Sequence, residues 1–440
     1  MPRGRDDRAE GDRITAYTWY VLAILTAFQT VHTIDRNVVY VVLEPLKREF
    51  HLTDGEAGAL GGLAHALTFA VTSVPLSWLA DRYNRTKLLS VMAGCWGALT
   101  LVCGFATSAS MLFLSRMGVG AAEGGTGPAC LSLIADYFPV RRRATALAVY
   151  FLSAAIGTGG TFMLGAQIAQ HYGWRAAFMV ASIPTFLIAL LAFFTLREPI
   201  RGRFDTAPTT ATAKPSLKQA FGEILRTPPL LCGVIGLTLS VAVIAAFYAF
   251  GVSFFVRTHG MSLGRAALLV GLATGLAHGV GSIVGGPVAD RLTQGKAERV
   301  GYFPATIVLL SIPSGALMLL GPSIPVSAVG LFLFTFFAGC WIPQGYAVPL
   351  ALAPARIRGS SVGFTQVFTN LLGTGSGPAL AGVLSDSYGN SLRYALLTML
   401  SLYFVGAVFF VLASRGASAR ERARAPMAHT DATDAVPLSA

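Results

Sequence analysis

Residues 77–87 read SWLADRYNRTK, and residues 285–296 read GGPVADRLTQGK. Each segment follows an apolar run of about 20 residues, which is the length that a helix needs to cross a bilayer. The Ala-Asp-Arg triplets at 80–82 and 289–291 therefore occupy equivalent places in two halves of the chain. Repeats of this kind predict two helical bundles related by an axis along the membrane normal, which is an architecture of secondary transporters.

The composition agrees with a chain that lies in a membrane. Of its 440 residues, 54% are hydrophobic and 12% are charged, about half the charged fraction of an average soluble protein. The apolar residues fall in runs long enough to cross a bilayer rather than in amphipathic periods. We therefore predict an all-α polytopic membrane protein with twelve transmembrane helices in two six-helix halves.

The net charge of +12 is distributed unevenly. Most of the 33 Lys and Arg residues fall in the tails and in the loops on one side of the predicted bundle. Cytoplasmic loops carry such an excess, so we predict that both termini are cytoplasmic. The basic residues are thus explained by topology and anionic membrane lipids, and we expect no nucleic acid as a partner. The short loops favour a multi-pass, monomeric protein of the bacterial inner membrane.

A linker rich in Thr, Ala, Pro and Arg separates the two halves. It contains a predicted amphipathic helix, Ser216–Arg226, which we expect on the membrane surface. The C-terminal tail is poor in bulky apolar residues, which predicts disorder. The predicted divisions are a cytoplasmic tail (1–15), an N-terminal half (16–196), the cytoplasmic linker (197–228), a C-terminal half (229–413) and the disordered cytoplasmic tail (414–440).

Four charged residues interrupt two of the apolar runs. Asp35 and Arg36 lie in the first run, and Arg116 and Glu123 lie in the fourth. An unpaired charge at the bilayer centre costs roughly 2.5–3.5 kcal/mol on insertion scales, so these side chains should face a polar interior and find partners. Neighbours in a helix point about 100° apart, so Asp35 does not pair with Arg36. The simplest arrangement is crossed, with Asp35 beside Arg116 and Arg36 beside Glu123.

These groups have the chemistry of a coupled transporter. A carboxylate that loses its arginine partner to an incoming anion takes up a proton in exchange. We therefore predict Asp35 as the main proton-coupling residue and Glu123 as the second. Arg36 or Arg116 would bind an anionic headgroup through its fork of donors. A structural polar cluster that joins the two helices is the alternative.

The second half carries no Asp, Glu, Lys or Arg well inside its predicted helices, but it is rich in aromatic residues. A cavity between the halves would then have charged residues on one side and apolar residues on the other. Such a cavity suits an amphiphile, whose headgroup contacts the charged side and whose chain contacts the apolar side. Aromatic residues in membrane helices also face lipid or the protein core, so packing is the alternative. Beyond the two arginines, the candidate substrate-binding residues are His32, Asn37, Phe247, Tyr248, Trp341 and Asn370.

The segment Asp81-Arg82-Tyr83-Asn84-Arg85 resembles the loop signature of the major facilitator superfamily, G-x-L-x-D-R-x-G-R-[RK]. Ser77 and Asn84 replace its two glycines, and Asn at the second position is similar to the Spinster-like branch. The likeness extends over nearly the whole chain and is more specific in the N-terminal half. The other similar segments are Asp35-Arg36-Asn37, Arg116 to Glu123, Asp136 to Arg143, Gly173-Trp174-Arg175 and Arg197-Glu198-Pro199.

This resemblance implies a lipid-like cargo, such as lysophospholipids, sphingosine-type phosphates or related amphiphilic anions, moved with or against protons. It also implies a gate in which Asp81 contacts the positive end of the helix that starts near Gly359. A solvated turn is the alternative interpretation of these loop charges. The implied gate residues are Asp81, Arg82 and Arg85, with Asp290 and Arg291 in the equivalent loop of the second half.

We therefore expect a proton-coupled secondary transporter of a lipid-like or amphiphilic organic anion that works by alternating access. A proton symporter of small organic anions of the sugar-acid type is one alternative. A polytopic lipid-modifying enzyme is a remote alternative, because the sequence contains no nucleophile motif or phosphate-binding loop. The five cysteines lie singly in apolar runs, which predicts neither a disulfide nor a metal site, and we expect no cofactor.

Overall fold

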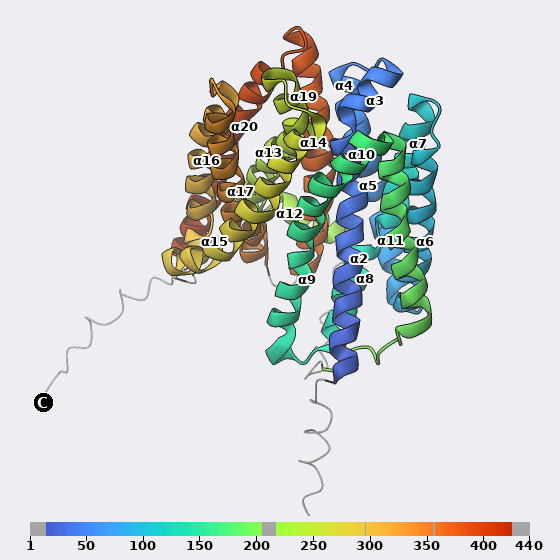
Figure 1. The fold of residues 1–440 in the computed structure, drawn as a ribbon. Helices are drawn as coiled ribbons and strands as arrows, with labels where there is room; N and C mark the ends of the chain where they lie inside the picture. Colours follow the sequence, from blue (N-terminus) through green and yellow to red (C-terminus); the bar gives the residue numbers. More distant parts are fainter. Residues whose placement is uncertain (1–14, 205–216, 295, 355–356, 425–440) are drawn as a thin grey trace, which may run out of the picture.

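The computed structural model describes residues 15–204, 217–294, 296–354 and 357–424, and the regular structure within these ranges is helical. In the first half, the helices follow the six predicted runs (Figure 1). They are α2 (Ala16–Val41) with α3 (Leu43–Phe50), α4 (Asp54–Gly61) with α5 (Leu63–Arg82), α6 (Arg85–Gly104), α7 (Ala109–Glu123) with α8 (Thr126–Tyr137), α9 (Val140–Gly160) with η1 (Thr161–Gly165) and α10 (Ala166–Tyr172), and α11 (Trp174–Thr195).

The second half repeats the pattern after the linker helix α12 (Leu217–Leu225). Its helices are α13 (Pro228–His259), α14 (Leu263–Leu272) with η2 (Ala273–Ala277) and α15 (His278–Thr293), α16 (Tyr302–Leu320), α17 (Ile324–Leu352), α18 (Arg358–Phe368) with η5 (Thr369–Gly375) and α19 (Ser376–Ser387), and α20 (Leu392–Arg424). Nine helices in the described ranges are individually long and apolar enough to cross a membrane. The runs 16–50, 109–137 and 358–387 complete the twelve-span pattern.

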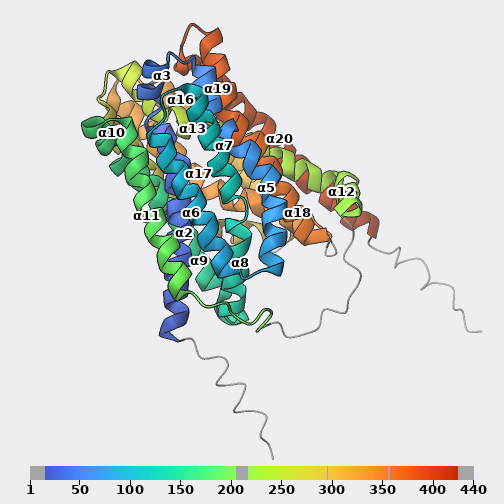
Figure 2. The same ribbon diagram turned by 90° about the vertical axis from the view of Figure 1, so that its right-hand side faces the viewer.

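The bundle has two distinct ends (Figures 1 and 2). We call the end that carries Ala16, residues 197–204 and Arg424 the terminal end, and the end that carries the turns at His51, Gly260 and Gly389 the distal end. Many large apolar side chains lie exposed on the outside of the bundle, which is the surface that a lipid environment requires. Examples are Leu114, Leu164, Leu187, Phe194, Ile283 and Val383.

The halves contact each other where helices approach closely at glycines. A Cβ added to Gly62 would lie 2.3 Å from the carbonyl oxygen of Gly375, so α4 and α5 pack directly on η5 and α19. A Cβ on Gly159 would lie 3.1 Å from the Cα of Gly275, where α9 meets η2. The small residues thus permit close contact between helices of different halves.

Three of the transmembrane runs contain a π-helical segment at these contacts: η1, η2 and η5. In the eleventh run, η5 includes Gly373 and Gly375. The fourth run is interrupted between α7 and α8, at Gly124 and Gly125. Local π-helical turns occur frequently at functional sites, so the halves meet at backbone that departs from the regular helix.

The predicted boundary between the second half and the C-terminal tail, at residue 413, was wrong. The last helix does not end at residue 413, because α20 continues to Arg424. Ser414 is buried and accepts a hydrogen bond from the backbone N–H of Gly301 at 2.9 Å, which holds the extension against the bundle. The remainder of the predicted disordered tail lies outside the described residues.

The linker helix α12 forms as predicted, but it packs on protein rather than only on the membrane surface. Ile224 is buried in a cluster that includes Leu230 and Ile357 of the second half. The ring of Phe221 contacts that of Phe364 edge-on, with centroids 5.3 Å apart. Its apolar face therefore has a protein partner in α13 and α18.

Candidate substrate and proton site

The crossed pairing predicted for the four buried charges is wrong. Arg116 of α7 is completely buried, and it donates from Nη1 to the backbone carbonyl of Asp35 (2.8 Å) and from Nη2 to that of Arg36 (3.4 Å). A carbonyl oxygen has two lone pairs, so it can accept these bonds in addition to its helical one. Arg116 therefore joins α7 to the backbone of α2 instead of pairing with a carboxylate.

Asp35 is completely buried. Its Oδ2 accepts a hydrogen bond from the hydroxyl of Thr185 in α11 at 3.2 Å, and Thr100 of α6 lies beside the same carboxylate. Both partners belong to the N-terminal half. Asp35 thus lies within the packing of that half, which does not suit its predicted role as the main proton carrier.

Glu123 is also completely buried, but its partners are two histidines. Its Oε2 lies 2.7 Å from Nε2 of His65 in α5 and 3.2 Å from Nε2 of His32 in α2. Its Oε1 is buried without a hydrogen-bond partner among the described residues. His65 stacks on Phe69 with centroids 5.6 Å apart. Since histidines titrate near neutral pH in water, this cluster contains groups that can exchange protons.

Arg36 lies next to this cluster and differs from Arg116 in its surroundings. Its side chain is half-buried, and no acceptor for its guanidinium is found in the described part of the chain. The neighbouring Asn37 is buried and donates to the hydroxyl of Thr158 in α9 at 3.1 Å. A half-buried guanidinium with no acidic partner is suited to an external anion.

The predicted residues of the second half divide into buried and accessible groups. Phe247 stacks on Phe334 with centroids 4.3 Å apart, and Trp341 is completely buried beside Tyr403. A cargo between the halves does not reach these two rings in this conformation. Tyr248 and Asn370 are half-buried and remain accessible.

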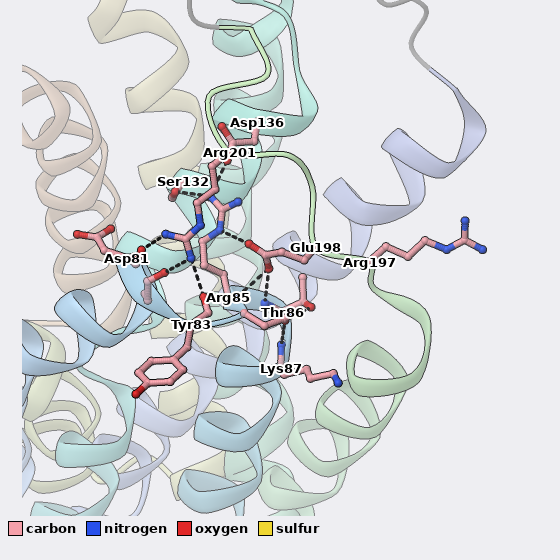
Figure 3. A network of polar contacts seen from close by, with 12 residues as sticks. Asp81, Tyr83, Arg85, Thr86, Lys87, Ser132, Asp136, Arg197, Glu198 and Arg201 are labelled. Carbon is pink, nitrogen blue, oxygen red and sulfur yellow. Dashed lines mark hydrogen bonds and ion pairs between the residues drawn. The ribbon is translucent and has the colours of Figure 1, made fainter. Parts of the chain in front are cut away.

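At the terminal end, Arg85 forms the centre of a buried network (Figure 3). Its guanidinium donates to Glu198 at 2.6 Å, to Asp136 at 2.6 Å and to the Ser132 hydroxyl at 2.6 Å. Glu198 also accepts hydrogen bonds from the backbone N–H groups of Arg85 (2.8 Å) and Thr86 (3.2 Å) at the start of α6. We call these residues, with Arg201, the terminal cluster. Arg85 is therefore part of a structural network and not of a solvated turn.

Arg201, from the start of the linker, binds the end of α5. Its guanidinium donates to the backbone carbonyls of Ala80 (2.9 Å), Tyr83 (2.6 Å) and Asp81. A cation at the carboxyl end of a helix is favourable, because the last carbonyls carry partial negative charge. Figure 3 shows the Asp81 side chain turned away from this network.

The other predicted gate residues are exposed. Arg82 lies over the ring of Trp78, 4.0 Å from its centroid. The carboxylate of Asp81 has no hydrogen-bond or ion-pair partner in the described ranges, and the same holds for the side chains of Asp290 and Arg291. The predicted contact of Asp81 with the start of α18 is therefore not formed in this conformation.

The distal end is closed by ion pairs between the halves. Arg257 of α13 donates from Nε to Glu44 of α3 at 2.6 Å and from its terminal nitrogens to both oxygens of Asp54 at 2.8 Å. Lys47 binds Asp54 at 2.6 Å. One buried carboxylate thus receives two cations, one from each half.

A second contact completes this distal cluster. Both oxygens of Asp386, at the end of α19, accept hydrogen bonds from the backbone N–H groups of Asp54 and Gly55 at 2.8 Å. Ser385 donates to Asp54 at 2.7 Å. A carboxylate at a helix N-terminus satisfies free donors and favours the positive end of the helix dipole. The distal end therefore holds the two halves together.

The profile of the major facilitator superfamily matches residues 25–375 and, separately, residues 273–437. The chain belongs to this superfamily. An MFS-type efflux pump of Mycolicibacterium smegmatis is 28% identical over 90% of this chain and 92% of its own. The sphingosine-1-phosphate transporter of Danio rerio is 26% identical over 88% and 82%, and a gallate transporter of Pseudomonas putida is 26% identical over 70% and 73%.

A solved bacterial homologue of the human lysosomal transporter Spinster, inward-facing and unoccupied, has a similar fold. Its TM-score is 0.83 at 26% identity, covering 92% of this chain and 98% of the homologue. Together with the Spinster relatives, this likeness places the chain in the Spinster-like branch. The protein is thus a membrane transporter and not an enzyme.

Sequence reasoning missed three parts of this arrangement. His65 was a lone histidine in an apolar run, and its relation to Glu123 depends on how α5 packs on α7. Asp136 and Glu198 were recognised only as parts of similar segments, without a role. Arg201 was one of several basic residues in the linker, and no signal in its neighbourhood indicated its contact with α5.

Proposed function

We propose that this protein is a proton-coupled secondary transporter of a lipid-like or amphiphilic organic anion. The observation that carries the proposal is the half-buried guanidinium of Arg36, which has no acidic partner in the described ranges and lies beside a buried carboxylate–histidine cluster. An anion bound to Arg36 would add negative charge to this enclosed region. A proton taken up by Glu123, His32 or His65 would offset that charge, and charge in a dry site is costly.

Within this proposal, Glu123 takes the first place among the proton-coupling residues. It contacts two titratable groups, and one of them, His32, retains some exposure at 12% of its side-chain surface. Asp35 has no exposed surface and contacts hydroxyl groups of the same half. We therefore assign Asp35 a supporting role in fixing α2 against α6 and α11.

The lipid-like nature of the cargo is supported by the contrast between the halves and by the relatives. The second half carries no Asp, Glu, Lys or Arg well inside its predicted helices, whereas Arg36 and Glu123 belong to the first half. One relative is a sphingosine-1-phosphate transporter, a carrier of an anionic amphiphile by its name. Alternating access would expose the site first at one end and then at the other.

We also propose that the terminal end is cytoplasmic, as the basic loops favour. The protein would then lie in a bacterial inner membrane as a monomer, with its distal cluster closed toward the outside. This orientation can be tested by labelling single cysteines at Ser387 and at Thr293 with a membrane-impermeant maleimide in whole cells. We expect the Ser387→Cys variant to be labelled and the Thr293→Cys variant to remain unlabelled.

The function can be tested in proteoliposomes with a panel of lysophospholipids and organic acids, with and without a pH gradient. We expect accumulation of an anionic lysolipid that requires the gradient. Glu123→Gln should abolish gradient-driven accumulation but retain exchange of internal for external cargo, whereas Arg36→Gln should weaken both. Gradient-independent accumulation by the wild type, or unchanged coupling in Glu123→Gln, would refute the proton-coupled mechanism.

A symporter of small organic anions is the second candidate, because a gallate transporter is among the relatives. The same panel separates the two. A small-anion symporter should take up short carboxylates with a KM that an excess of long-chain lysolipid does not change. A lipid transporter should be inhibited by that lysolipid.

A further inference from the structure

A polar pair lies in the otherwise apolar second half. The hydroxyl of Tyr248 in α13 lies 3.0 Å from Nδ1 of His278, the first residue of α15. Both side chains are half-buried. The Nε2 atom of His278 has no hydrogen-bond partner among the described residues, and they do not enclose it.

The position of His278 relates it to the charged site of the first half. Gly275, three residues earlier, packs on Gly159 of α9, and the preceding Thr158 binds Asn37, the neighbour of Arg36. A Cβ added to Gly279 would meet no atom within 4 Å, so there is open space beside this part of α15. His278 thus lies next to open space and about one turn from the contact of η2 with α9, which leads through Thr158 and Asn37 to Arg36.

The hydrogen bond with Tyr248 indicates which nitrogen carries the proton of the neutral ring. The phenol has no other acceptor in the described part of the chain, so we assign its O–H as the donor to Nδ1. Nδ1 then offers its lone pair, and the ring proton lies on Nε2. The open nitrogen is therefore a hydrogen-bond donor.

We propose that Nε2–H of His278 donates a hydrogen bond to the anionic headgroup of the cargo, and that Tyr248 is a positioning residue that fixes this tautomer. The headgroup, a phosphate or carboxylate, would then be held between Arg36 of one half and His278 of the other. This inference rests on the proposed function, because it requires an anionic cargo between the halves. It adds a contact that the second half makes only with the bound cargo.

Amide side chains provide matched variants. His278→Gln places an amide NH2 near the position of Nε2, whereas His278→Asn reaches only the position of Nδ1. In proteoliposomes with lysophosphatidate, we expect His278→Gln to keep the KM within about threefold of the wild type. His278→Asn should raise it about tenfold, which corresponds to 1.4 kcal/mol. Neutral monoacylglycerol of the same chain length, if carried, should not distinguish the two variants.

Tyr248→Phe tests the tautomer. As a single substitution, Tyr248→Phe should raise the KM for lysophosphatidate severalfold. Added to His278→Gln, it should have no further effect, because an amide has no tautomer to fix. Equal KM values for the Gln and Asn variants, or equal losses for charged and neutral cargo, would overturn the role of His278 while leaving the proposed function intact. A thermal melt of each variant shows whether both remain folded.

If the wild type carries aromatic carboxylates instead of lysolipids, the same variants are compared with gallate, since a carboxylate accepts the same hydrogen bond. The lipid part of the proposed function then fails, and the role of His278 is judged by the Gln–Asn difference alone. A wild type that moves none of these anions would overturn both proposals.

Discussion

At the scale of single residues, two side chains that are adjacent in the sequence differ in their burial and in their partners. Asp35 and Arg36 are adjacent in α2, yet Asp35 is buried against α6 and α11, whereas Arg36 is half-buried and its guanidinium has no acceptor among the described residues. The difference follows from the helix itself, which turns successive side chains about 100° apart. One position therefore stabilises the N-terminal half, and the next is available to an external anion.

This assignment predicts a clear difference between two carboxyl-to-amide changes. Asp35→Asn should lower the thermal stability and the yield, because it places an amide NH2 in a completely buried site where one carboxyl oxygen accepts a hydrogen bond from Thr185. The transport that remains should keep the pH profile of the wild type. Glu123→Gln should instead lose the pH dependence while it stays folded. Transport rates between pH 5 and 8 in proteoliposomes check this prediction, and a flat profile in Asp35→Asn would contradict it.

At the scale of elements, the start of the linker stabilises the loop between α5 and α6. Glu198 and Arg201 bind groups at the two adjoining helix ends, and Asp136 binds both Arg85 and the backbone N–H of Gly202 at 2.9 Å. The N-terminal half therefore has a defined structure at its terminal end in a conformation in which the carboxylate of Asp81 has no partner among the described residues.

Loss of one carboxylate from the terminal cluster should be costly. Arg85 is only 2% exposed, and Glu198→Gln would weaken a charged hydrogen bond to it, at about 1.5–3 kcal/mol. The melting temperature in detergent should fall by several degrees, and protease cleavage in residues 197–204 should accelerate. Lys87→Gln, a change at an exposed neighbour, is the control and should change neither quantity.

A surface contact at the distal end gives a pH-dependent prediction. Hydrogen bonds from Arg175 and from Trp174 lower the pKa of Glu49 from its usual value. The contact therefore stabilises the fold above the ordinary Glu pKa and is lost as the pH falls through the lowered one. Because Glu49 is about 40% exposed, its replacement by Gln should cost at most about 1 kcal/mol at neutral pH. The difference in melting temperature should shrink below pH 4; a constant difference would contradict the assignment.

At the scale of the whole molecule, the contacts between halves define one conformation. The distal cluster is formed, and the carboxylate of Asp81 at the terminal end has no partner in the described ranges. With the distal end toward the outside, as proposed above, this closure would correspond to the inward-facing conformation in which the solved Spinster homologue is found.

Removal of Arg257, the cation that binds both Glu44 and Asp54, should shift the equilibrium between conformations with a closed and an open distal end. Arg257→Gln deprives Glu44 and Asp54 of their shared partner, so the open distal end should become more populated. Spin labels at Arg48→Cys and Ser387→Cys, in a background without the exposed Cys95, should show a larger fraction of long distances. Asp81→Asn in the same background is the matched control and should not raise that fraction. An unchanged distance distribution in Arg257→Gln would show that the distal cluster does not set the equilibrium.

The sequence predicted the fold well because its signals are local. Runs of apolar residues and the repeated Ala-Asp-Arg triplet each indicate the structure of one segment. Partners of buried charges are not local: Glu123 and His65 are 58 residues apart, and Arg201 and Asp81 are 120 apart. Which charge meets which partner depends on helix rotation and packing, and a single sequence does not encode these in any short pattern.

The contact of Asp386 with the start of α4 has an energetic consequence for the transport cycle. Asp386, near the end of α19, binds the start of α4 here, whereas the carboxylate of Asp81, near the end of α5, has no partner in the described ranges. If Asp81 binds the start of α18 when the distal end opens, one carboxylate–dipole interaction is lost and a similar one is gained at the opposite end. These two contacts would then largely cancel in the free-energy difference between the two conformations, and the ion pairs around Arg257, together with the cargo, would decide the direction in which this carrier faces.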